Sequence, residues 1–222
     1  MLTFLSIFCV GAVTSHHILF VHTTGTKSHL IQMAPLAEEL LARGHQVTGI
    51  FFNSLKLKHE NYTEMVVPFD MDNIMKESSK LLMEKGGTNA YNPRLWLWAW
   101  QMWGDLLENS TRGVFENQGV NHLLESHQTV DVVITFMYSG SFFAEYFDCH
   151  IIQFSPAGPV PWLIQGTGNV FNPSIQPLLN SPFIEPMTFS QRLLTHLSVP
   201  VFGMIMQRLS DGAHRSQIQQ RF

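Results

Sequence analysis

The sequence has 222 residues but only two cysteines, few charged residues and no excess of positive charge. Cys9 and Cys149 allow at most one disulfide, which excludes a small secreted module held together by several disulfides. With 13 Lys and Arg against 17 Asp and Glu, the formal net charge is −4. No basic field is present to attract nucleic acid, so a nucleic-acid partner is not expected.

Sequence motifs for phosphate binding, hydrolysis and metal binding are also missing. The segment TTGTKSH at 23–29 has one glycine and fits neither GxGxxG nor the P-loop. The segment YSGSF at 138–142 does not fit the GxSxG of serine hydrolases, which argues against a secreted hydrolase. His16, His17, His22 and His29 form no HExxH or Cys/His box, so we predict no metal site.

Residues 1–15 are predicted to form a signal peptide. The run MLTFLSIFCVGAVTS is apolar, too short to span a bilayer, and places Val13 and Ser15 at the −3 and −1 positions of a cleavage site. Cleavage would remove Cys9 and leave 16–222 with Cys149 alone. The alternative is an apolar extension of the first strand.

The same compartment is favoured by two glycosylation sequons, Asn61-Tyr62-Thr63 and Asn109-Ser110-Thr111, which are acceptors if the segment enters the secretory lumen. No later segment is long and apolar enough for a transmembrane helix. We therefore expect localisation in the endoplasmic reticulum lumen or the secretory pathway, with contact to a membrane surface as an alternative.

The fold is predicted to be α/β, with a Rossmann-like, doubly wound and mostly parallel sheet. Within His17–Phe52, an apolar strand leads into a loop, a helix from about Leu30 that Arg43 and Gly44 end, and a β-branched strand. The same β-loop-α-β pattern recurs at 131–154. The remaining expected elements are a strand at 65–69, helices at 72–85, 94–108 and 111–125, and a helix at 187–209 broken at Pro200, with no element in 211–222.

The segment 94–108 carries Trp96, Trp98, Trp100 and Trp103 within eight positions. At helical spacing Trp96, Trp100 and Trp103 share one face. Two readings stay open: a helix buried in the core, or an apolar wall for a lipophilic ligand or a membrane. The segment 155–186 is rich in Pro, Gly and Asn, and long loops of this kind are often functional.

His29 follows the first strand, at the point where ligands bind to a parallel sheet. An imidazole titrates near neutral pH and can take a proton from a hydroxyl group. The sequence alone leaves two interpretations open: a catalytic base, or a histidine that caps or packs at the start of the helix.

The segment SHLIQMAPLAEELLARGHQVTGI at 28–50 resembles the amino-terminal part of the UDP-glycosyltransferases, particularly those of arthropods. The segments SPAGPVPW at 155–162 and GNVFNPSIQPLLNSPFIEPMTFSQRL at 168–193 resemble the same family. The resemblance implies the amino-terminal, acceptor-binding domain of the two-domain GT-B fold. It implies transfer of a hexosyl or glucuronosyl group from a UDP-sugar to a small lipophilic hydroxyl compound with inversion, without a metal or cofactor, and with His29 as the base.

Acceptor-binding candidates under this resemblance are Trp96, Trp100, Phe136, Pro159 and Trp162. The family usually orients its histidine with an acidic residue where this chain has Phe136, which cannot accept a hydrogen bond. Loss of such a carboxylate costs orders of magnitude in rate in other enzymes.

A carboxyl-terminal donor domain and the membrane anchor of full-length relatives are further family features that these 222 residues do not include. An alternative is therefore a non-catalytic lipophile-binding or regulatory partner that associates with full-length relatives.

Overall fold

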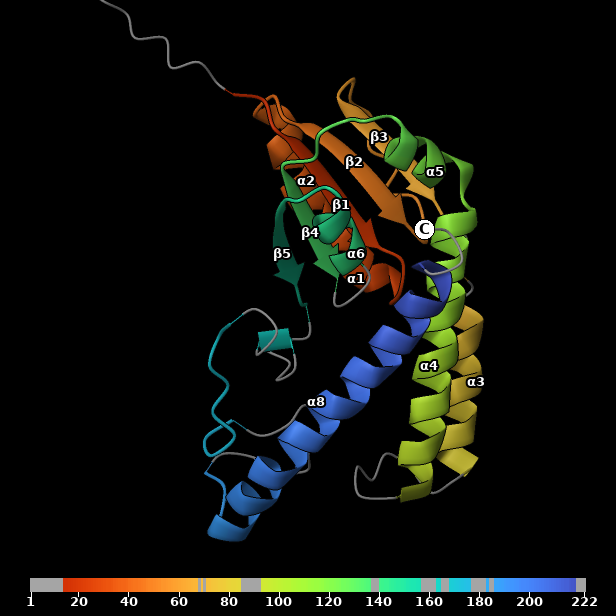
Figure 1. The fold of residues 1–222 in the computed structure, drawn as a ribbon. Helices are drawn as coiled ribbons and strands as arrows, with labels where there is room; N and C mark the ends of the chain where they lie inside the picture. The colour runs from red at the N-terminus through yellow and green to blue at the C-terminus, as the bar shows by residue number, and fades with distance from the viewer. Residues whose placement is uncertain are drawn as a thin grey trace, which may run out of the picture.

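The protein is built on five parallel strands flanked by helices (Figure 1). The computed structural model describes residues 14–67, 69, 71–84, 93–136, 140–156, 163–164, 168–176, 183 and 186–218. The strands are β1 (His17–His22), β2 (Gln46–Phe51), β3 (Tyr62–Val66), β4 (Val132–Phe136) and β5 (His150–Phe154). The helices are α1 (Lys27–Ile31), α2 (Ala34–Ala42), α3 (Met71–Glu84), α4 (Pro93–Glu116), α5 (Gln118–Glu125), α6 (Ser141–Tyr146) and α8 (Phe189–Ile218).

The spatial order of the strands is β3-β2-β1-β4-β5, and every neighbouring pair is parallel. The chain therefore runs outward in one direction from β1 to β3 and in the other direction from β4 to β5. This order confirms the predicted Rossmann-like, doubly wound sheet. Its direction reverses between β1 and β4, which makes the carboxyl ends of these two strands the expected ligand-binding edge.

Alternating residues of β1 belong to two separate hydrophobic cores, one on each face of the sheet. Ile18 and Phe20 pack with α1 and α2, whereas Leu19 and Val21 pack with α4, α5 and α6. All four side chains are buried. A strand covered on both faces explains why the run of 18–21 is continuously apolar.

The helix predicted from about Leu30 is present but broken. It consists of α1 and α2, separated by a turn at Gln32 and Met33. Pro35 is the cause, because it has no N–H to donate to the preceding turn and is tolerated only at the start of a helix. Gly44 ends α2 with φ of +85°, as its sequence position predicts.

Three other predicted boundaries were wrong. The break expected between 108 and 111 is absent, because α4 continues to Glu116 and α5 begins at Gln118. The third strand covers 62–66 instead of 65–69, and its pairing with β2 ends when the Val67 N–H donates to the Phe51 carbonyl. The last helix continues through Pro200 and extends to 218. Pro200 lies inside α8, where a proline costs roughly 3 kcal/mol, and α8 packs against α4.

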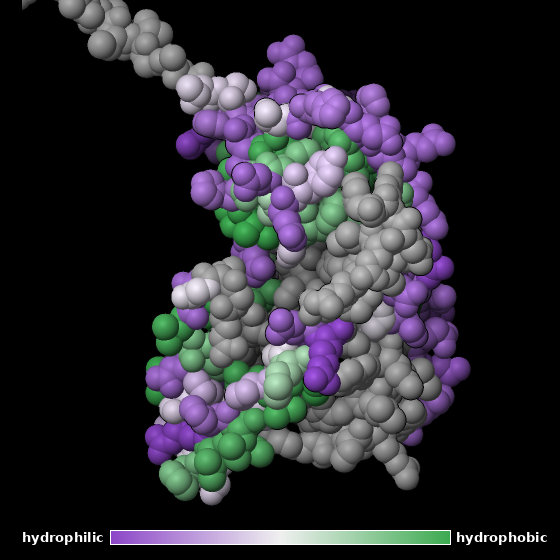
Figure 2. All heavy atoms as spheres, in the orientation of Figure 1, coloured by the Kyte–Doolittle hydropathy of each residue, from purple (hydrophilic) through white to green (hydrophobic). Residues whose placement is uncertain are grey.

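Helix α8 crosses below the sheet and carries exposed apolar side chains along one stripe (Figures 1 and 2). Members of this stripe are Phe189, Leu193, Leu197, Val201 and Met204. Over the described residues, the helices are all too short or too polar to cross a membrane.

Gly49 tests how tightly the core on the α1–α2 side is filled. It pairs with Phe20 in the register of β1 and β2, and a methyl group added at Gly49 would overlap the buried Phe51 ring. We expect Gly49→Ala to lower the free energy of unfolding by about 1–3 kcal/mol in denaturant titrations. In the Phe51→Leu background the cost of the same change should shrink; an equal cost in both backgrounds would contradict this account.

Candidate functional site

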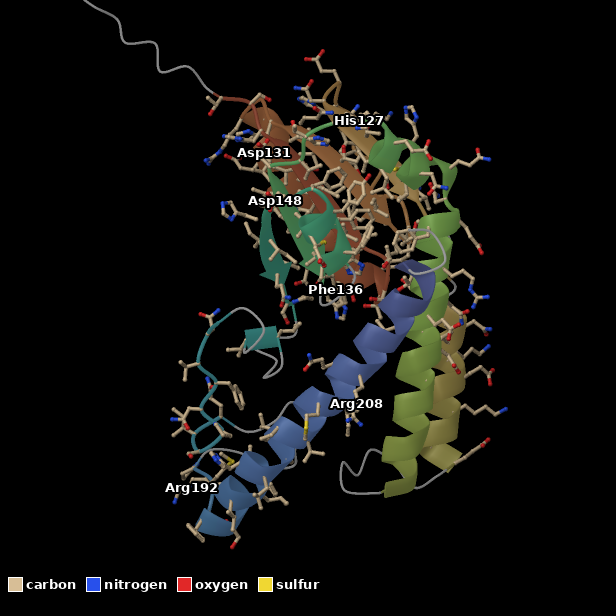
Figure 3. All side chains as sticks on the ribbon, viewed as in Figure 1. His127, Asp131, Phe136, Asp148, Arg192 and Arg208 are labelled. Carbon is tan, nitrogen blue, oxygen red and sulfur yellow. The ribbon has the colours of Figure 1, made fainter. Side chains whose placement is uncertain are left out.

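The candidate site lies at the carboxyl ends of β1 and β4. His22 is the last residue of β1, Phe136 is the last residue of β4, and the loop 23–26 leads from His22 to α1. Phe136 is labelled at this end of the sheet, beside α1 (Figure 3). Both His22 and Phe136 lie on the same face as Ile18 and Phe20, because side chains alternate along each strand.

His29 lies in the middle of α1, directly over this edge. The amino-terminal cap of α1 is Thr26, and the His29 N–H donates to the Thr26 carbonyl at 3.0 Å. The cap interpretation of His29 is therefore wrong. Its ring is partly exposed, yet Nδ1 is buried and has no hydrogen-bond partner in the described part of the chain.

Burial lowers the pKa of His29 below its usual 6.5, because a desolvated imidazole resists protonation. His29 is therefore neutral at neutral pH. A neutral imidazole has one nitrogen that can accept a proton and one that can donate. This is the protonation state that a general base requires.

The His29 ring contacts the ring of Phe136, the last residue of β4. The two ring centroids are 5.3 Å apart and the ring planes are inclined by 34°. Phe136 also stacks on His22, with centroids 4.3 Å apart and planes inclined by 17°. The structure thus brings His29 and Phe136 together, as the resemblance to the family implies, and adds His22 to the same cluster of rings.

His22 is fully buried and neither ring nitrogen has a hydrogen-bond partner among the described residues. Burial is the main cause that lowers the pKa of His22 to about 3; an interaction with its own backbone opposes this shift, and repulsion between the protonated forms of His22 and His29 adds to it. The sequence analysis did not single out His22. The available signal was its place at the end of β1, two residues after Phe20 on the same face.

Gly25 allows the loop to close over these rings. Its φ is +120°, which a residue with a side chain rarely adopts. A Cβ at Gly25 would lie 2.9 Å from His22 Cε1 and 3.0 Å from Phe136 Cε1. The glycine backbone therefore seals the stacked pair from above.

Carboxylates are missing from this edge, as far as the structure describes it. Neither of the two ion pairs among the described residues, His16–Asp131 and Arg43–Glu39, includes His29. Glu145 is exposed on α6, and no hydrogen bond joins it to His29. The residue that meets the His29 ring from β4 is apolar.

The other predicted acceptor-binding residues are not tested. The backbone of Trp96 and Trp100 is helical in α4, but their side chains lie outside the described residues, as do Pro159 and Trp162. Nearer the carboxyl end of α4, the Ser110 hydroxyl donates to the Thr23 carbonyl and lies 2.8 Å from Thr23 Oγ1. This contact ties α4 to the loop of the candidate site.

The hollows beside the described residues include a small one and a large one. One, of about 10 Å³ beside Thr23, Ser110 and Phe143, has room for no more than a single water molecule. The other is an open polar depression of about 500 Å³ near His17, His127 and Asp131, at the opposite edge of the sheet. Its position at the amino ends of the strands disfavours it as the ligand site of a parallel sheet.

Metal binding receives no support from the described residues, where no group of three or more His, Cys, Asp or Glu side chains could hold an ion.

The two predicted glycosylation sequons differ in their local structure and burial. Asn61 lies in the turn before β3, and Thr63 is exposed. Asn109 lies within α4, where Ser110 and Thr111 are buried.

Comparison with known proteins gives one family match. Residues 17–221 match the family described as "UDP-glucoronosyl and UDP-glucosyl transferase". Similar curated proteins include UDP-glycosyltransferase UGT4 of Dactylopius coccus, 29% identical over 203 residues, and UDP-glucuronosyltransferase 2B9 of Macaca fascicularis, 26% identical over 201 residues. These matches cover 85% and 81% of this chain and 36% of each relative.

Among solved structures, the chain is similar to CalG4, the calicheamicin glycosyltransferase, with a TM-score of 0.38 and 13% sequence identity. The match covers 74% of this chain and 38% of that one. A likeness this low carries no argument about fold or function. The fold assignment rests on the strand order.

The unpaired His22 imidazole predicts acid sensitivity. Its pKa falls from 6.5 to about 3 on folding, so the unfolded chain binds more protons between these values and stability decreases as the pH falls through them. His22→Phe should remove this contribution. As the pH falls from about 6.5 to 4, the free energy of unfolding of the variant should therefore rise relative to that of the wild type. The difference between the two should change by up to ~1.4 kcal/mol per pH unit.

The matched control is Phe20→Leu, which removes buried apolar volume from the same face without removing a titratable group. Its cost should be the same at every pH. Parallel stability curves for His22→Phe and the wild type would contradict the assignment of His22 as a buried neutral imidazole.

Proposed function

The chain belongs to the UDP-glucoronosyl and UDP-glucosyl transferase family, and from this premise we propose that it forms the acceptor-binding part of a UDP-glycosyltransferase of GT-B architecture. The observation that carries the proposal is His29, a neutral and partly exposed imidazole at the carboxyl edge between β1 and β4. The reaction is transfer of a hexosyl or glucuronosyl group from a UDP-sugar to a small lipophilic hydroxyl compound.

In this reaction His29 acts as the general base. Its exposed nitrogen accepts the proton of the acceptor hydroxyl while the oxygen forms a bond to the anomeric carbon of the sugar. The bond between that carbon and the UDP oxygen breaks, and UDP leaves with the bonding electron pair. Attack from the face opposite UDP inverts the anomeric configuration. Neutral His29 is suited to this step because its burial holds the pKa down.

The UDP-sugar is proposed to bind to a part of the enzyme that the sequence does not contain. The chain spans about 36% of the length of its curated relatives. Its own loop 23–26 has a single glycine, and this glycine is packed on His22 and Phe136 instead of opening a phosphate cradle. Both observations favour a division of labour in which this domain holds the acceptor.

A second candidate function is a lipophile-binding or regulatory partner of full-length relatives that does not catalyse transfer. Phe136 favours it, because this residue meets His29 where the family usually places an acid. An apolar ring can neither accept the Nδ1 proton nor stabilise an imidazolium ion. The two functions share the same acceptor site and differ in turnover.

The transferase proposal is tested with a chimera that joins 16–222 to the remaining part of the UGT4 relative. We expect it to transfer sugar from a UDP-sugar to a 4-alkylphenol, and His29→Ala to lower the rate by about 10²–10⁴-fold, the usual contribution of a general base. The exposed His59→Ala should leave the rate unchanged. Binding of the phenol without transfer, in a chimera that folds, would favour the second function.

The proposed localisation is the endoplasmic reticulum lumen or the secretory pathway. When the full chain is expressed in insect cells, we expect mass spectrometry to find a mature protein that begins at His16 and carries a glycan on Asn61. Asn61 lies in a turn with its Thr63 exposed, so the sequon is accessible. Asn61→Gln should remove the glycan mass. A protein that retains Met1 and carries no glycan would contradict this localisation.

A further inference from the structure

In the described part of the chain, the Nδ1 atom of His29 is buried and has no hydrogen-bond partner. Phe136 is the side chain from β4 that contacts the His29 ring. Both nitrogens of His22 lack partners as well, so neither accepts a proton from His29. Because His29 Nε2 is neither buried nor hydrogen-bonded in the described part of the chain, it is the nitrogen that solvent or a ligand reaches.

The Phe136 ring cannot replace a hydrogen-bond acceptor through its π face. An N–H bond of imidazole lies in the plane of the imidazole ring. Since the His29 and Phe136 planes are inclined by only 34°, this bond makes at most that angle with the Phe136 plane. An N–H···π contact requires the bond to point into the face of the ring. A proton on Nδ1 would therefore have no acceptor in the part of the chain that the structure describes.

The two neutral tautomers of His29 are consequently unequal. A proton on Nδ1 would bury a donor that makes no hydrogen bond, which folded proteins avoid. A proton on Nε2 remains exposed and can be hydrated. Free imidazole side chains also prefer the Nε2–H form, so local structure and intrinsic chemistry favour the same tautomer.

We propose that Phe136 leaves the proton of His29 on Nε2, so that the resting site presents a hydrogen-bond donor and takes lipophilic molecules with a carbonyl or ether oxygen. This inference rests on the proposed function, in that lipophilic molecules bind at His29. It makes Phe136 a positioning residue that sets the tautomer of His29. The base-competent form, with its lone pair on Nε2, is then the minor form, and Phe136 limits the rate of transfer.

The tautomer is measured on the ligand-free chain by long-range ¹H–¹⁵N correlation NMR with ¹⁵N-labelled histidine, above the pKa of His29. We expect Nε2–H in the wild type and in Phe136→Leu, which is apolar and offers no acceptor. Phe136→Asp places a carboxylate at this position and should shift the proton to Nδ1. Phe136→Asn, with a neutral amide oxygen, provides the same test if the aspartate variant does not fold.

The proposal is overturned if the wild type carries the proton on Nδ1, or if the wild type and the folded acceptor variants share one tautomer. A general loss of packing cannot mimic the expected result, since Phe136→Leu also loses the aromatic contacts and should keep Nε2–H. The NMR result does not depend on transfer. Failure of the chimera to transfer sugar would therefore refute the proposed function and leave the tautomer assignment standing.

The ligand class is measured by titrating the chain with two probes of equal size, 4-butylacetophenone, which only accepts hydrogen bonds, and 4-butylphenol, which also donates. The acceptor variant at 136 should lower the affinity for the ketone relative to the phenol by roughly three- to tenfold, the worth of one neutral hydrogen bond. An unchanged ratio of affinities overturns the ligand class. If neither probe binds, both the ligand class and the acceptor-binding function are overturned.

Discussion

Exclusion of water from the junction of β1 and β4 is the constraint on which the site depends. His22 stacks on Phe136, Phe52 tilts against His22, and Gly25 closes the loop over the stack. Two imidazoles are thereby held neutral next to each other, since charging either one would place an ion in a desolvated setting. The chemistry of His29 is set more by this desolvation than by any charged partner.

The doubly wound sheet was predictable because it follows from local residue patterns that indicate strands and helix ends directly. The apolar run of β1, the β-branched run of β2 and the repeat at β4 and β5 specify buried parallel strands, and Gly44 marks a helix end. The break before Pro35 and the continuity through Pro200 were not predictable in the same way. A proline at the start of a helix and one inside a helix differ in what packs around them, and that information is tertiary.

For the site, it was the resemblance to the family that placed Phe136 beside His29, and the structure brings the two rings together. The place of His22 at the end of β1, two residues after Phe20, was the available signal, but that position alone does not separate a buried stacked ring from a solvated one. Nor could the sequence show that Gly25 is required by the rings of His22 and Phe136, which lie far from each other in the sequence. Burial and stacking geometry are consequences of packing that no spacing rule encodes.

The hydrogen bonds from Ser110 to Thr23 place the middle residue of the Asn109 sequon inside the folded domain. Thr111, whose hydroxyl a glycosylating enzyme must engage, is also buried once α4 is in place. In a secretory compartment Asn109 could therefore be modified only while α4 is still unfolded or undocked. Glycan occupancy at Asn109 would therefore depend on the rate of glycosylation relative to the rate of folding. It would report how long α4 stays undocked from the sheet in the nascent domain.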